Sequence, residues 1–106
     1  MDRHKKQELR RESLDRTRRE MLAERAAALA RITRTLERQL SRLHRMRRDI
    51  PTILGPKRKK HLATYAALRD KAEIYRWYLK VQREVNGLYD GDTLEERYPI
   101  PGPLTD

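Results

Sequence analysis

The chain has 106 residues, and 26 Lys or Arg against 16 Asp or Glu give it a formal net charge of +10. The absence of cysteine excludes disulfides and thiolate chemistry. Charged residues make up 40% of the chain, and there is no Phe and one Trp, a composition that favours long helices over a compact globular domain.

Residues 1–20 are dense in charge, with Leu9 and Leu14 as their main apolar side chains. Glu12 precedes Arg16 by four positions, with the acid first, which is the orientation that supports a helix. We therefore expect a charged N-terminal helical extension over residues 1–20. It is either a solvated helix or a basic arm that becomes ordered on a partner.

Apolar residues then repeat at every seventh position over the next thirty or so residues, which is typical of a long helix packed on another helix. We expect this helix to continue to about Arg48. Pro51 is expected to end it by forcing the preceding residue into an extended conformation. The members of the repeat are Leu22, Leu29, Leu36, Leu43 and Ile50.

Residues 49–56, with two prolines and a glycine, predict a turn. We expect Ile53 and Leu54 to fold back over the end of the core, and Pro56 to occupy the first turn of the next helix. A short connection of this kind favours antiparallel helices.

A second helix is predicted from about Lys57 to Asn86, where Asn86-Gly87 supplies a left-handed end. It carries two apolar stripes on different sides. One neighbouring helix covers only one of them, so the other needs a further partner. The first stripe contains Tyr65, Leu68, Ala72, Tyr75 and Leu79, and the second contains Ile74, Tyr78, Val81, Val85 and Leu88.

Residues 90–106 form an acidic tail that is rich in proline. A capping box with Asp92 as the N-cap predicts a short helix over 93–97, stopped by Pro99. The last residues are expected to be extended, either packed locally or bound as a peptide in a groove. Three apolar residues are placed to return onto the second helix: Leu94, Tyr98 and Ile100.

The predicted fold is all-α: a long antiparallel helical hairpin (coiled coil) with a short C-terminal helix and an extended Pro-rich tail. Its parts are the extension 1–20, the hairpin 21–89 with its turn at 49–56, and the tail 90–106. We expect a cytoplasmic protein, because the N-terminus lacks a signal peptide's apolar core and no apolar run approaches the roughly 20 residues of a membrane span.

No catalytic constellation is found in the sequence. His44 and His61 are expected to approach each other across the hairpin, but two histidines with cationic neighbours do not make a zinc site. We therefore predict no catalytic residues, no metal site, no cofactor and no small-molecule substrate.

Arginines recur every three or four positions along the face opposite the apolar repeat, and a basic cluster follows the turn. This face is either merely solvated, or it binds nucleic acid, or it binds an acidic protein or membrane surface. The candidate polyanion-binding residues are Arg31, Arg34, Arg38, Arg42, Arg45, Arg48, Lys57, Arg58, Lys59 and Lys60.

The leading functional hypothesis is a non-enzymatic coiled-coil assembly or adaptor protein, which binds itself as a homodimer or a coiled-coil partner through apolar helix faces. The alternative is sequence-independent binding of DNA, RNA or a ribonucleoprotein through the arginine face. Trp77 lies off both stripes, where an exposed Trp suggests a contact site, because Trp is a frequent interface anchor. The candidate interface residues are Ile74, Trp77, Tyr78, Val81, Val85 and Leu88.

Overall fold

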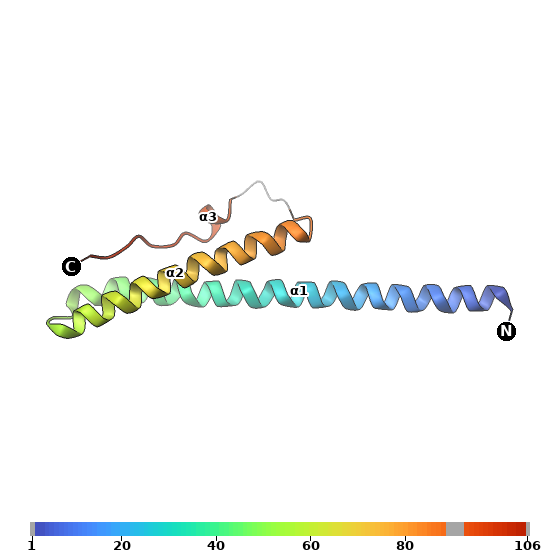
Figure 1. Cartoon of the computed structure of the whole chain (residues 1–106), viewed down its shortest axis with the longest axis horizontal. Coiled ribbons are helices and arrows are strands. Elements are labelled where there is room, and N and C mark those ends of the chain that lie inside the picture. The colour runs from blue at the N-terminus through green and yellow to red at the C-terminus, as the bar shows by residue number, and fades with distance from the viewer. Residues whose placement is uncertain (1, 89–92, 106) are drawn as a thin grey trace.

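The computed structural model of the chain describes residues 2–88 and 93–105. It is all-α, as predicted, and its two long helices pack antiparallel (Figure 1). Helix α1 is Arg3–Asp49, α2 is Pro56–Val85 and α3 is Leu94–Arg97, with a 3-10 turn, η1, at Ile50–Thr52. The molecule is a rod with extents of 80 × 28 × 15 Å.

The two long helices differ in length. Helix α1 has 47 residues, or about 70 Å, and α2 has 30 residues, or about 45 Å. The N-terminal part of α1 therefore extends well beyond the end of α2 (Figure 1). Every residue from 2 to 27 is exposed, and we call the segment 3–27 the overhang.

This difference limits the predicted apolar repeat. Leu36, Leu43 and Ile50 are buried, and Leu29 is half-buried against the core. Leu22 is 62% exposed, so the expectation that it packs on the second helix is wrong. It lies in the overhang, on the part of α1 that α2 does not cover.

The turn also departs from expectation at two positions. Ile50 keeps helical dihedrals (φ −54°, ψ −42°), because the chain continues into η1 instead of becoming extended before Pro51. Its side chain is 2% exposed and closes the end of the core. Leu54, which we expected to do this, is 81% exposed. Pro56 begins α2 as predicted.

The end of α2 is a Schellman motif. Gly87 has φ +72°, its N–H donates to the Glu84 carbonyl (3.0 Å), and the Leu88 N–H donates to the Arg83 carbonyl (2.8 Å). The predicted left-handed end at Asn86-Gly87 is confirmed.

The core lies between α1 and α2, and among the described residues it contains no buried polar or charged residue. The first predicted stripe of α2 supplies half of it, with Tyr75 half-buried at its side. The buried residues are Leu36, Leu40, Leu43 and Ile50 before the turn and Tyr65, Leu68, Ala72 and Leu79 on α2.

The tail adds a third layer to the hairpin. Leu94, Tyr98 and Ile100 pack against the core as predicted, and so does Leu104. The N-cap of α3 is Thr93, whose hydroxyl accepts from the Glu96 N–H (3.4 Å). The expected cap, Asp92, lies outside the described residues.

Leu43→Ala should lower the free energy of unfolding by about 2–5 kcal/mol, because it leaves a cavity at a fully buried position. Leu54→Ala should change it by less than about 0.5 kcal/mol, because that side chain already meets water. Urea unfolding followed by circular dichroism measures both. Equal losses for the two variants would contradict this core.

Candidate functional site

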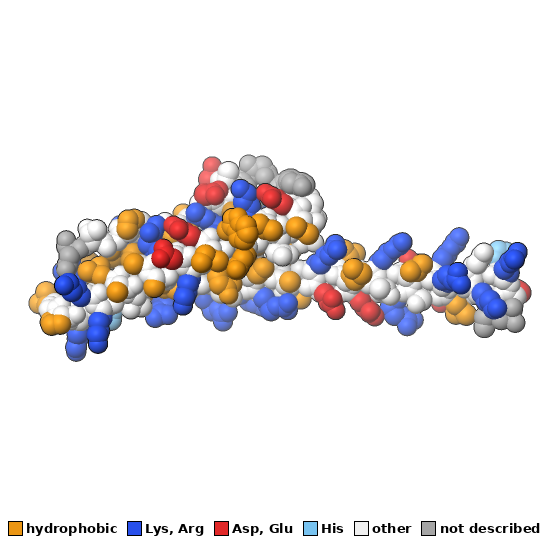
Figure 2. Space-filling view, viewed as in Figure 1, with side chains coloured by type: hydrophobic (Ala, Val, Ile, Leu, Met, Phe, Trp, Pro, Cys, Tyr) orange, Lys and Arg blue, Asp and Glu red, His pale blue; other side chains and the backbone are white. Residues whose placement is uncertain are grey.

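Helix α2 exposes a row of large apolar side chains, which we call the α2 face: Ile74, Trp77, Tyr78, Val81, Val85 and Leu88. Val81 is half-buried, and the other five are between 44% and 67% exposed. Figure 2 shows hydrophobic side chains gathered over the middle of the molecule, next to α3. The predicted second stripe is thus left largely exposed by α1 and by the described part of the tail, and its role as an interface stays a prediction.

The aromatic rings of this face are packed on one another. The Tyr78 ring lies 5.6 Å from that of Trp77, tilted by 53°, and 5.8 Å from that of Tyr75, nearly perpendicular at 78°. Edge contacts of this kind add stability beyond the buried area. Tyr78 therefore links the exposed Trp77 to the half-buried Tyr75, which makes the face more rigid than isolated side chains would be.

A shallow groove on the α2 face has an acidic edge. It is lined by Ile74, Trp77 and Tyr78 together with Asp70 and Glu73. The Glu73 carboxylate lies 3.4 Å from the Arg69 guanidinium, whereas Asp70 makes no hydrogen bond or ion pair to another described residue. The groove therefore suits a partner that combines apolar and basic side chains.

The predicted basic residues also lie on the surface. We call the six on α1 the arginine ridge: Arg31, Arg34, Arg38, Arg42, Arg45 and Arg48. All six are exposed, and so are Lys57, Lys59 and Lys60, while Arg58 is half-buried. Basic side chains follow one long edge of the molecule in Figure 2.

Positively charged side chains predominate around the arginine ridge. Arg34, Arg38, Arg42 and Arg45 line one shallow surface groove, in which Glu37 is the single acid among the lining residues. Arg48 lies 3.4 Å from Asp49 at the end of the helix. The groove therefore presents mainly guanidinium groups to solvent, and whether it binds a polyanion stays a prediction.

The histidines form no ligand set with other described residues. His44 and His61 are both exposed, and the described part of the chain has no group of three His, Cys, Asp or Glu side chains placed to hold a metal ion.

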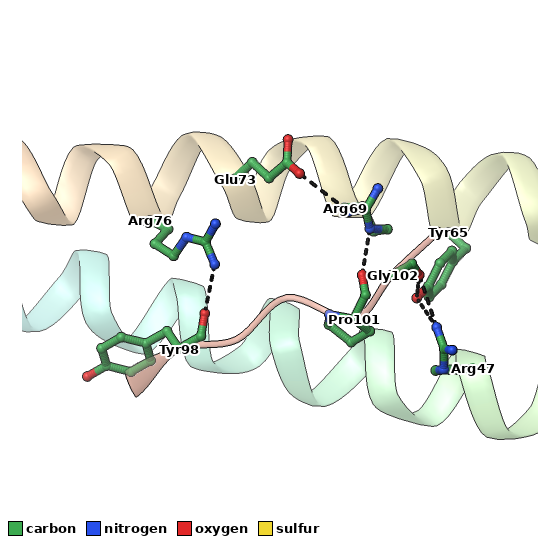
Figure 3. A network of polar contacts seen from close by, with 8 residues as sticks. All are labelled: Arg47, Tyr65, Arg69, Glu73, Arg76, Tyr98, Pro101 and Gly102. Atoms are coloured by element: carbon green, nitrogen blue, oxygen red, sulfur yellow. Dashed lines mark hydrogen bonds and ion pairs between the residues drawn. The ribbon is translucent and has the colours of Figure 1, made fainter. Parts of the chain in front are cut away.

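The structure shows a third arrangement that the sequence did not predict, a set of side chains that hold the tail (Figure 3). The Arg69 Nε–H donates to the Pro101 carbonyl (2.6 Å), and Arg76 Nη1 donates to the Tyr98 carbonyl (3.2 Å). The Gly102 carbonyl accepts from the Tyr65 hydroxyl (2.7 Å) and from Arg47 Nη1 (3.0 Å). Three arginines and a tyrosine thus bind three carbonyls of the tail, those of Tyr98, Pro101 and Gly102.

Prolines explain why side chains hold this segment. Pro99, Pro101 and Pro103 have no N–H group, so the tail cannot pair as a regular strand, and its carbonyls need donors from elsewhere. Hydrogen bonds from a charged donor are stronger than neutral ones. Of the two expected states of the tail, the structure shows local packing, with the tail bound to its own hairpin.

Comparisons with protein-family models, with curated proteins and with solved structures find no match for this chain. Within the described residues, no helix has an apolar stretch long enough to cross a membrane. The surfaces of the molecule itself therefore supply the argument for its function.

Tyr65→Phe should lower the free energy of unfolding by about 0.5–1.5 kcal/mol, because the buried ring stays while the hydrogen bond to Gly102 is lost. Hydrogen exchange should also become faster in residues 98–104, which the hydroxyl helps to hold. Tyr75→Phe is the control, because the Tyr75 hydroxyl bonds to no described residue. If the two variants behave alike, the hydroxyl does not hold the tail.

Proposed function

We propose that this chain is a non-enzymatic assembly or adaptor protein, which binds a protein partner or a second copy of itself through the α2 face. The observation that carries the proposal is the exposure of Ile74, Trp77, Tyr78 and Val85 side by side on one helix. Contiguous apolar patches on soluble proteins mark interaction sites more often than scattered single residues do. Trp and Tyr are also the residues that most often anchor interfaces.

The shape of the molecule supports the same function. A rod 80 Å long presents its helices sideways, so a partner helix can lie along it for several turns. Covering one of these half-exposed side chains stabilises a complex by about 1 kcal/mol. Because association itself costs about 4–15 kcal/mol, the partner must contact several residues of the face at once.

The double variant Ile74→Glu with Val85→Glu should abolish association while leaving the unfolding of the single chain nearly unchanged, because both side chains are already exposed. Sedimentation velocity measures the association and thermal unfolding measures the fold. Leu54→Glu is the matched control, because it places the same charge on an exposed apolar position at the far turn. Association that survives the double variant would rule out the α2 face.

A second candidate function is sequence-independent binding of DNA or RNA through the arginine ridge and the basic residues 57–60. The guanidinium-rich groove on α1 favours it, because arginine matches the geometry of phosphate groups. An acidic protein is an alternative ligand for the same ridge. Nucleic acid differs in how strongly salt weakens its binding, because phosphate binding releases counterions.

Changing Arg34, Arg38 and Arg45 to Glu should abolish binding to duplex DNA and RNA if the ridge is the site. Wild-type affinity should fall steeply with salt, with a slope in log K against log[salt] of about −0.9 per neutralised phosphate of duplex DNA. Fluorescence anisotropy at two salt concentrations measures both. Arg10, Arg16 and Arg19 changed to Glu carry the same charge change on the overhang, and equal losses would assign the binding to net charge alone.

A further inference from the structure

We infer that the α2 face is covered by the overhang of a second copy of this chain, and that the two copies exchange this contact reciprocally in a symmetric dimer. The inference rests on the proposed function, because it uses the same face, and it names the occupant. It unites two features of the described part of the chain: a helix segment whose residues are all exposed and an apolar face that stays about half exposed.

The overhang accounts for about half of α1, and none of its residues is buried. All of its residues are exposed, including Leu14, Met21 and Leu22, which are at least half exposed. Most helices in proteins depend on packing for their stability, because helix propensity alone is marginal in water. The overhang therefore has a side that gains from a partner helix.

Three arginines of the overhang lie on the side that would contact a partner helix. Arg11, Arg18 and Arg25 repeat at every seventh position, and the same spacing continues to Ile32 and, past Gln39, to Met46. Both of these later residues pack against the core between α1 and α2. The three arginines and the neighbouring Leu22 therefore extend the packing side of α1 beyond the end of α2.

The α2 face carries a complementary repeat. Asp70, Trp77 and Glu84 also recur at every seventh position, and all three are exposed. Trp77 is 58% exposed, so the face of its ring has room for a cation. An acid, an aromatic ring and a second acid thus follow one another along α2, each one heptad apart.

When the overhang of one copy lies parallel to α2 of the other, the two repeats match in one register. It places Arg11 opposite Asp70, Arg18 opposite Trp77 and Arg25 opposite Glu84, so that two ion pairs enclose one cation–π contact. In the same register the apolar side chains of the overhang meet those of α2. These are Leu14 beside Ile74, and Met21 and Leu22 beside Val81.

A two-fold axis perpendicular to α1, and beside its middle, provides the required direction. The axis reverses α1, and α2 already runs antiparallel to its own α1, so the overhang of one copy runs parallel to α2 of the other. The overhang is about 37 Å long and α2 about 45 Å, so the contact fits within α2. Both contacts form at once, and the assembly is closed.

Charge favours this occupant over a second α2 face. Two α2 faces packed together bring the acids of both copies into one interface, and they leave both overhangs without a partner. In the inferred dimer the acids meet arginines, and the arginine ridge faces away from the packing side of α1. The apolar contacts then supply most of the affinity, while the ion pairs select the register, because exposed ion pairs are individually weak.

Charge reversal tests the register in the full-length chain. Asp70→Arg with Glu84→Arg, and separately Arg11→Glu with Arg25→Glu, should each weaken self-association about tenfold or more, because like charges then meet in both contacts. Mixing the two variants should restore association. In the mixed dimer one contact is wild-type and the other carries the reversed pairs.

Sedimentation velocity measures the dimer, and the fluorescence of Trp77, the one Trp of the chain, should shift to shorter wavelength as the overhang covers it. Arg16→Glu with Arg19→Glu is the matched control. It carries the same charge change off the packing side of α1, and by itself it should leave self-association unchanged.

A wild-type chain that stays monomeric at micromolar concentration overturns the inference. A dimer that both reversals leave intact, but that Ile74→Glu with Val85→Glu dissociates, also overturns it and leaves the proposed role of the α2 face standing. A dimer that survives all of these variants contradicts both.

Discussion

The unequal length of the two long helices is the constraint on which the rest of the structure depends. Antiparallel packing matches α2 only to the C-terminal half of α1, from about Leu29 to the turn, and the shared core forms there. One consequence is the overhang, which no part of α2 reaches. A second is that a single neighbouring helix buries one stripe of α2 and leaves the α2 face in water.

The tail completes the core that two helices cannot enclose alone. Two helices bury little apolar surface for their length, and a third element adds to it. Here that element is an extended segment whose prolines remove its own donors, so Arg47, Arg69, Arg76 and Tyr65 supply them. The side of α2 next to the tail is therefore occupied, and the large apolar side chains that α2 leaves exposed lie on the α2 face.

Local patterns predicted much of the fold. One failure is local, because Ile50 stays helical before Pro51, and the others are non-local. Seven-residue spacing and turn chemistry identified both helices, the buried stripe of α2 and the glycine end at Gly87. The predicted packing of Leu22 was wrong, because the burial of this residue depends on where α2 ends. The roles of Arg47, Arg69 and Arg76 could not be predicted. A hydrogen bond between a side chain and a carbonyl far along the chain leaves no repeating pattern in the sequence. The exposure of the predicted site residues was foreseen, and their partners are not in the sequence.

Three groups of arginines in this molecule differ in their position relative to the core. That position determines which partners each group can bind. Arg69 and Arg76 lie beside the buried stripe and bind tail carbonyls, so they are unavailable to a ligand. The ridge arginines face away from the core, where guanidinium groups meet only solvent or a polyanion. Arg11, Arg18 and Arg25 lie on the packing side of α1 in the overhang, where a helix packed on them would need acidic or aromatic side chains opposite. A net charge of +10 is thus weak evidence for nucleic-acid binding by itself, because part of it holds the tail on the hairpin and part lies where we infer a contact with a second chain.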